Sequence, residues 1–358
     1  MKGNTKEFLK KKGINISPKT YFVDAMGGMA QGLFASLLVG TILTTISKYI
    51  GMIDGVFFER FAHFLSRAGA MSSAISGAAI GVGIAAALNA PMLVMACAAA
   101  VGYFANAYPG QPYAAGPLGV FIAVIIAVEF GKAISKETKV DILVTPLVTL
   151  GLGYLTAYLT CPVIAIAMNW IGEFINYATT MHPFVMGIII SVVVGIILTL
   201  PISSAAICAS IGISGIAGGA ALAGCCAQMV GFAVASFREN KWGGVVSQGL
   251  GTSMLQMPNI VKKPVIWIPA TLAAAITGPL ATIVFKLECS KVSAGMGTCG
   301  MVGPIGCFSD MSASGTLDAK AWIGMAVVCV IAPAVLSLVF SEIMRKLGWI
   351  KPDDMKLS

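Results

Sequence analysis

Long runs without a charged residue dominate the chain. No Asp, Glu, Lys or Arg occurs between Arg67 and Glu129, or between Glu173 and Arg238. Each of these runs is long enough for two crossings, because one membrane-spanning helix takes about 20 apolar residues. Shorter uncharged runs cover Ala25–Ser47, Ile142–Gly172, Pro264–Phe285 and Ala321–Ser341. A soluble all-helical protein would need a charged face on most of its helices, so the pattern predicts a polytopic membrane protein.

The uncharged runs divide into helices at their polar and glycine-rich interruptions. We expect helices near residues 25–48, 67–88, 91–107, 115–134, 142–170, 183–200, 205–236, 264–286 and 321–345. Two further segments, Trp242–Val261 and Val292–Ser309, are uncharged but rich in glycine and short polar residues. Irregular backbone at membrane depth is tolerated only in protein or beside a water-filled cavity, so we expect re-entrant hairpins or loops there. The predicted fold is all-α, with about eight to ten transmembrane helices in a single domain over residues 1–358.

Composition agrees with this class, and the charge distribution adds an orientation. Hydrophobic residues make up 57% of the chain and charged residues 11%, with a mean hydropathy of +0.89 and a net charge of +8. Six lysines lie in residues 1–20, and basic residues again follow the last hydrophobic run. Because basic flanking segments mark the cytoplasmic side, we expect residues 1–20 and 346–358 to be cytoplasmic. This placement favours a lipid bilayer, and not a nucleic acid, as the partner of the positive charge.

The stretch "ILTLPISSAAICASIGISGIAGGAALAGCC" combines a helix break with hydroxyl groups and small residues. Pro201 cannot donate a backbone hydrogen bond, and it kinks or ends a helix. Membrane carriers place substrate at such breaks, where freed backbone groups and polar side chains converge. Ser203 and Ser204 follow the break directly. Two interpretations stay open: the serines bind a ligand, or they only satisfy the backbone at the break.

Further uncharged polar residues lie in or near the segments that fit a plain crossing least well. Gln228 follows the break in the same uncharged run, Ser253, Gln256 and Asn259 lie in the first predicted re-entrant segment, and Thr298 lies in the second. Amides and hydroxyls both donate and accept hydrogen bonds, which suits a neutral, polyhydroxylated ligand. Each residue can also serve only to hold helices together. We predict that these five residues, with Ser203 and Ser204, bind the solute.

Two carboxylates adjoin hydrophobic runs. Glu129 and Asp141 flank the short charged segment between two predicted helices. Ionisable groups at membrane depth are costly and therefore suggest a function. We assign gating or coupling to Glu129, Asp141 and the Pro201 break.

Catalytic and metal-binding patterns are absent from the sequence. It contains no P-loop, no HExxH and no GxSxG motif. The nine cysteines show no CxxC spacing and lie mostly in apolar surroundings, where cysteine behaves as a small hydrophobe. We predict no catalytic residue on this chain, no metal site and no cofactor.

Several longer motifs resemble one family. They are "SKETKVDILVTPLVT" (135–149), "LTLPISSAAI" (198–207), "GCCAQMVGFAVASFREN" (224–240), "GTSMLQMPNI" (251–260), "GPLAT" (278–282) and "GMGTCGMVGPIG" (295–306). The sequence is similar in these segments to the phosphotransferase-system enzyme IIC-like membrane proteins, which include the perfringolysin O regulator group. The resemblance implies a transporter of the bacterial inner membrane, a homodimer, that carries a sugar while a IIB partner, supplied by IIA, phosphorylates it. The glutamate and histidine of well-studied sugar-transporting members have no clear counterpart here; His182 is the nearest candidate.

We therefore expect a carbohydrate permease that works by alternating access. Two alternatives remain. One is an ion-coupled secondary transporter, with Asp141 or Glu129 as the coupling carboxylate. The other is a membrane-bound regulator that senses a ligand without transporting it.

Overall fold

The structure is a computed structural model that describes residues 2–108, 115–291 and 293–357. Met1, Val292 and Ser358, which belong to the predicted termini and the second predicted re-entrant segment, lie outside the described residues. The chain folds into two compact units, unit 1 with residues 1–40 and 70–167, and unit 2 with residues 41–69 and 168–358. The described residues form helices and loops without a β-strand, which confirms the predicted all-α membrane fold.

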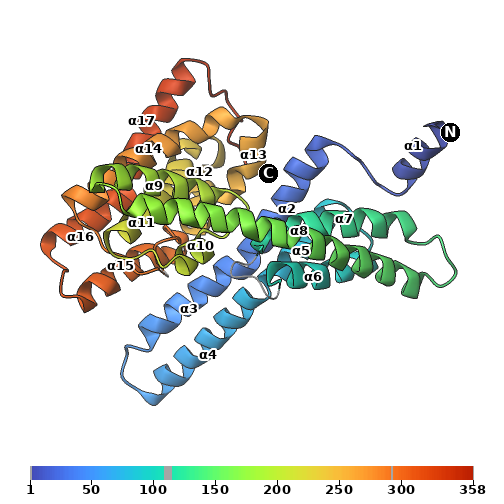
Figure 1. Cartoon of the computed structure of the whole chain (residues 1–358), viewed down its shortest axis with the longest axis horizontal. Helices are drawn as coiled ribbons and strands as arrows, with labels where there is room; N and C mark the ends of the chain where they lie inside the picture. The colour runs from blue at the N-terminus through green and yellow to red at the C-terminus, as the bar shows by residue number, and fades with distance from the viewer. Residues whose placement is uncertain (1, 109–114, 292, 358) are drawn as a thin grey trace. The chain divides into compact units, whose positions relative to one another are not determined.

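The elements of unit 1 are α1 (Lys2–Lys11), η1 (Thr20–Ala25), α2 (Met26–Leu33), η2 (Phe34–Leu38), α5 (Ser76–Ala87), α6 (Met92–Asn106) and α7 (Gly116–Ile134). The core helices of unit 1, α5, α6 and α7, are apolar around most of their circumference, whereas its first helix, α1, is polar. Three further helices, α3 (Val39–Ile50), α4 (Val56–Ala74) and α8 (Asp141–Thr179), have residues in both units (Figure 1).

Unit 2 contains more and shorter helical elements, because glycine and proline interrupt its sequence often. They are α9 (Pro183–Thr199), α10 (Ser204–Ser210), α11 (Gly215–Ala235), α12 (Phe237–Val245), η3 (Val246–Gly251), η4 (Ser253–Gln256), α13 (Met257–Lys262), η5 (Pro264–Trp267), α14 (Ile268–Pro279), η6 (Leu280–Val284), η7 (Cys299–Met301), α15 (Val302–Ala313), α16 (Ala319–Ala326), η8 (Val327–Ile331) and α17 (Ala332–Lys346). Helix α11 lies at the centre of the unit and packs against α9, α14 and α17.

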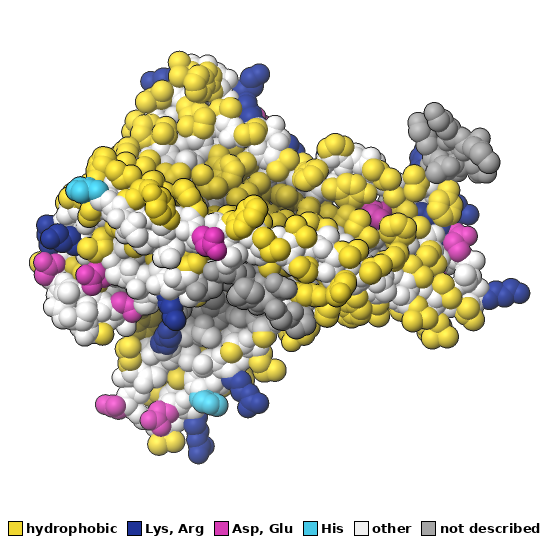
Figure 2. Space-filling view, viewed as in Figure 1, with side chains coloured by type: hydrophobic (Ala, Val, Ile, Leu, Met, Phe, Trp, Pro, Cys, Tyr) yellow, Lys and Arg dark blue, Asp and Glu magenta, His cyan; other side chains and the backbone are white. Residues whose placement is uncertain are grey.

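Helices of membrane-spanning length are frequent in the described part of the chain. Six are long and apolar enough to cross a bilayer, or seven if the bent pair α4 and α5 counts as one span. Two shorter apolar helices, α6 and α9, add to these, and the predicted number of crossings is reached only if they also span. Hydrophobic side chains cover much of the face drawn in Figure 2, as lipid contact requires. The protein is an integral membrane protein.

The structure corrects the expected helix over residues 205–236. It is two helices, α10 and α11, separated by a turn in which Gly212 and Gly215 have φ angles of +71° and +62°. Positive φ favours glycine because it lacks a Cβ, so the glycine run after Pro201 forms a turn before it packs. The helix expected near residues 142–170 also runs further, to Thr179.

The central helix α11 approaches its neighbour α9 very closely. A Cβ on Gly224 would lie 1.8 Å from the carbonyl oxygen of Ser191. Small residues at such crossings let helix backbones touch in an apolar environment. This contact holds the break that follows α9 beside the middle of α11.

Candidate functional site

Two helix breaks of unit 2 meet at one group of neutral polar side chains. The first break separates α9 from α10 at Pro201, as the sequence predicts. The second lies at Thr252, where the backbone is extended between η3 and η4, within the first predicted re-entrant segment. Thr199, the last residue of α9, and Ser253, the first of η4, place their hydroxyl oxygens 2.8 Å apart. The two breaks are therefore joined by a side-chain hydrogen bond.

The amide of Gln228 on α11 extends this contact. Its Oε1 accepts hydrogen bonds from Trp267 Nε1 at 3.1 Å and from Thr199 Oγ1 at 3.4 Å, and its Nε2 donates to Thr271 Oγ1 at 3.2 Å. An indole N–H can only donate, so the Trp267 contact fixes which end of the amide faces it. We call Thr199, Gln228, Ser253, Trp267 and Thr271 the Gln228 cluster. Its members come from four segments that are distant in the sequence.

The Gln228 cluster is deeply buried and carries no charged residue. Thr199, Gln228 and Ser253 are each 0% exposed, and Trp267 and Thr271 are partly buried. The Thr199 hydroxyl has a single proton and lies within hydrogen-bonding distance of the acceptors Gly195 O and Gln228 Oε1. It also contacts the Ser253 hydroxyl, and either of these two hydroxyls can be the donor.

Ser204 and Thr298 contact backbone carbonyls. Ser204 Oγ donates to Gly295 O at 2.7 Å, and Thr298 Oγ1 donates to Gly249 O at 2.5 Å. Both hydroxyls thus tie the glycine-rich loop before η7 to the helix breaks. Ser203 is partly buried at the break, where its carbonyl accepts a hydrogen bond from Ile207 N.

Gln256 and Asn259 form a second group, with partners other than those of Ser253. Asn259 Nδ2 donates to Gln256 Oε1 at 2.9 Å, and Gln256 Nε2 donates to Gln248 Oε1 at 2.9 Å. Both amides also donate to main-chain carbonyls of the C-terminal segment, on Met355 and Lys356. The predicted solute-binding residues are therefore distributed over separate groups.

The two predicted carboxylates lie in unit 1 and contact its own elements. Asp141 begins α8 and accepts hydrogen bonds from Lys136 N at 2.7 Å and Thr145 Oγ1 at 2.6 Å, which tie the preceding loop to the first turn of the helix. Glu129 Oε2 lies 3.4 Å from Nζ of Lys132 on the same helix. The gating and coupling roles given to these residues stay predictions.

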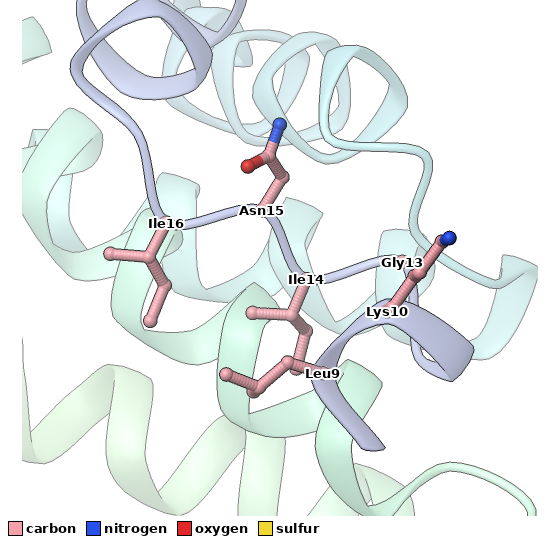
Figure 3. A pocket seen from close by; sticks show the side chains of 6 residues that line it. All are labelled: Leu9, Lys10, Gly13, Ile14, Asn15 and Ile16. Carbon is pink, nitrogen blue, oxygen red and sulfur yellow. The ribbon is translucent and has the colours of Figure 1, made fainter. Parts of the chain in front are cut away.

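A pocket of about 600 Å³ lies on the N-terminal segment of unit 1, and none of the predicted site residues lines it. Leu9, Lys10, Gly13, Ile14, Asn15 and Ile16 line it. In Figure 3 the Asn15 amide points away from the apolar side chains of Leu9 and Ile14. Only two of the lining residues, Lys10 and Asn15, have polar side chains, so we do not place the solute there.

Three members of the Gln228 cluster were not predicted. Thr199 lies two residues before Pro201, and a hydroxyl that close to a break is a usable signal. Trp267 and Thr271 are four residues apart and so share one helical face, which is a weaker signal. All nine cysteines are free thiols, and eight are buried. The described residues contain no group of His, Cys, Asp or Glu that could hold a metal ion.

Comparison with known proteins places the chain in a family. None of the curated proteins compared matches it. The model of the family described as "Phosphotransferase system, EIIC" matches residues 23–357. This match confirms the resemblance seen in the sequence motifs and extends it to both units. The chain therefore belongs to the phosphotransferase system EIIC family, the membrane permease components of sugar phosphotransferase systems.

Proposed function

We propose that the chain binds a neutral, polyhydroxylated solute, a sugar or a polyol, at the Gln228 cluster and carries it across the membrane by alternating access. Membership of the EIIC family implies partnership with IIA and IIB proteins and a sugar substrate. We further propose a bacterial inner-membrane location, a homodimer, and cytoplasmic ends at residues 1–20 and 346–358. The basic residues that flank the hydrophobic helices support this orientation.

The meeting of the two helix breaks at Gln228 carries the proposal. Carriers bind solutes near the middle of the bilayer at discontinuous helices, where movement of one half-helix against another changes access. In this chain the break after α9 and the break at Thr252 share the Thr199–Ser253 hydrogen bond. A solute that replaces this bond would separate the two breaks.

The chemistry of the cluster favours hydroxyl groups over charged ones. The hydroxyls of Thr199 and Ser253 and the Gln228 amide can both donate hydrogen bonds to solute hydroxyls and accept them. No charged residue is present to compensate a carboxylate or an ammonium group, and burial of an unpaired charge is costly. An indole ring such as that of Trp267 also offers an apolar face to a sugar ring.

The proposal is tested by titrating purified protein with sugars and polyols, with and without sodium, by thermal shift. A ligand that binds the folded state raises the unfolding temperature as its concentration exceeds the Kd. Gln228→Ala removes three hydrogen-bonding contacts, and we expect the Kd of the bound sugar to rise about tenfold or more.

Thr277→Val is the matched control. Thr277 is equally buried in unit 2, but its hydroxyl bonds to Ala274 O of its own helix at 3.3 Å. We expect this variant to bind the sugar with unchanged affinity. Binding that requires sodium or is confined to organic acids would instead support an ion-coupled transporter, and binding without uptake would support a regulator. Equal affinity of the Gln228→Ala variant and wild type would remove the cluster from the site.

A further inference from the structure

The C-terminal segment Trp349–Leu357 follows α17 and lies on buried amides of unit 2; Figure 1 shows the C-terminus beside α13. The amide of Asn240 contacts its main chain twice, because Nδ2 donates to Met355 O at 2.8 Å and Oδ1 accepts from Leu357 N at 2.8 Å. Gln256 Nε2 also donates to Met355 O at 2.8 Å. Asn259 Nδ2 donates to Lys356 O at 2.9 Å. We call Asn240, Gln256 and Asn259 the C-terminal amide site.

These contacts bind the backbone of a short peptide that turns at residues 352–355, where Asp353 has a φ of +66°, and three side chains add to them. Met355 is 0% exposed, and its sulfur lies 3.7 Å from Arg345 Nη2. Asp354 pairs with Lys263 at 2.5 Å, outside the membrane-spanning helices. In contrast, the side chain of Lys356 is exposed, and only its main chain contacts the site. Met355 is thus the apolar anchor beside the amides, and Ile350, which is 2% exposed, is a second buried apolar side chain of the segment.

The hydrogen bonds between the C-terminal amide site and Trp349–Leu357 are of a kind that allows the segment to leave. Neutral amides that lose a peptide carbonyl can bond to water instead, with a small net change in free energy. The main cost of release is the exposure of two apolar side chains, Ile350 and Met355, and the loss of one partly exposed ion pair. A segment held in this way can leave without unfolding the helices beneath it.

Release of Trp349–Leu357 would affect the Gln228 cluster, because the two share the η4–α13 segment. Gln256 and Asn259 belong to η4 and α13, the same short segment that carries Ser253 of the Gln228 cluster. The η4–α13 segment is therefore held both by the Thr199–Ser253 hydrogen bond and by the C-terminal segment. Removal of the C-terminal segment leaves the η4–α13 segment with fewer contacts to hold it beside the Thr252 break.

We propose that the C-terminal amide site is a docking site for a short peptide segment, and that Trp349–Leu357 occupies it as a releasable latch that closes access to the Gln228 cluster. The docking site stands independently of transport, while the role of the latch in solute access rests on the proposed function. None of the measurements below uses a solute, so failure of the proposed function would not affect how they are interpreted.

Hydrogen–deuterium exchange on the full-length protein tests the latch with two neighbouring substitutions. Met355→Ser removes the anchor, and we expect the backbone amides of residues 252–263 to exchange about tenfold faster or more. Lys356→Ser keeps the main-chain contacts, and we expect exchange close to that of the wild type. Equal exchange in the two variants would overturn the proposal.

A chain ended after Gly348 gives the second measurement. We expect a synthetic peptide of residues 349–357 to restore protection of residues 252–263 in a saturable way, and the same peptide with Met355→Ser to fail. No restoration by the wild-type peptide would overturn the docking site. Failure of both the truncated chain and the Met355→Ser variant to fold would also overturn the proposal, because a releasable latch leaves a folded protein behind.

Access to the Gln228 cluster is measured with Ser253→Cys and a water-soluble thiol reagent. We expect modification at residue 253 to be about tenfold faster when Met355→Ser is added, and unchanged when Lys356→Ser is added. The parent chain without Ser253→Cys corrects for reaction of the native thiols. Equal modification rates in the two double variants would overturn the latch.

Discussion

Both units bury polar side chains, but the buried contacts of the N-terminal segment in unit 1 centre on a charge, whereas the Gln228 cluster of unit 2 is neutral. Unit 2 buries charge elsewhere, in the Arg345–Glu239 ion pair. In unit 1 the side chain of Lys132 is 2% exposed, and its Nζ donates to Gly13 O at 2.7 Å and to Leu88 O at 2.8 Å. Glu129 completes the contacts as the ion-pair partner of Lys132. In unit 2, Gln228 and Ser253 are equally buried but neutral.

The difference indicates which buried groups can change partners. A buried ammonium group cannot lose its partners without leaving an uncompensated charge, which costs several kcal/mol. A neutral amide or hydroxyl exchanges one partner for another, or for water, at about 1 kcal/mol. Unit 1 therefore uses its charge as a fixed anchor for the N-terminal segment, while the neutral polar groups of unit 2 suit exchange with a solute or a peptide.

Lys132→Met tests the anchor most severely. It leaves the Glu129 carboxylate without its cation and two carbonyls without their donor, so we expect a loss of about 3–5 kcal/mol in the free energy of unfolding. Chemical denaturation in detergent micelles measures this loss. Adding Glu129→Gln to Lys132→Met removes the uncompensated charge, and we expect the double variant to be more stable than the single one. A double variant with fully additive losses would contradict the ion-pair account.

Ser204→Ala tests a neutral contact of unit 2, and we expect a smaller effect. The variant loses one hydrogen bond to Gly295 O, which should lower the free energy of unfolding by about 1 kcal/mol. The same variant decides between the two interpretations of the serines at the break. Unchanged sugar affinity would mean that Ser204 only holds the glycine-rich loop, whereas weaker binding would assign it to the solute site.

The Lys12–Glu137 ion pair also holds the N-terminal segment, and because Glu137 is exposed we expect its effect to be the smallest. Lys12 Nζ donates to Ser135 O and pairs with Glu137 at 2.5 Å. The hydrogen bond that Lys12 donates to the Glu137 carboxylate, together with the charge of Lys12, holds the pKa of Glu137 below its usual value. A carboxylate with a lowered folded-state pKa stabilises the folded state above its unfolded pKa of about 4.3, and this contribution is lost as the pH falls through the folded pKa.

We therefore expect pepsin to cleave the N-terminal segment slightly faster as the pH falls below about 4. In the Glu137→Gln variant cleavage should be faster above the folded pKa of Glu137 and equal to that of the wild type below it, and its remaining pH dependence should be that of pepsin alone. The same pH dependence in both proteins, after correction with an unfolded substrate, would show that the Lys12–Glu137 pair does not hold the segment.

Local features of the molecule followed closely from the residues. The uncharged runs identified the membrane class, since no other environment tolerates so few charges over such lengths. Pro201 identified the end of α9, because proline cannot continue a helix. The composition of Trp242–Val261 excluded a plain crossing, and the structure has a helix broken at Thr252 there. The glycine turn that separates α10 from α11 was missed, because glycine in a membrane helix more often indicates close packing.

By itself the sequence determined the class, the breaks and the family, because each depends on residues that are adjacent along the chain. The tertiary structure alone decided which polar groups meet. Gln228 joins Trp267 and Thr271 because α11 packs against α14, and Gln256 and Asn259 meet the C-terminal segment because α17 returns beside α11. No periodicity in the sequence predicts these pairings, because a helix that is apolar all round has several equivalent faces. Close contact at glycines selects the face that packs against a neighbour.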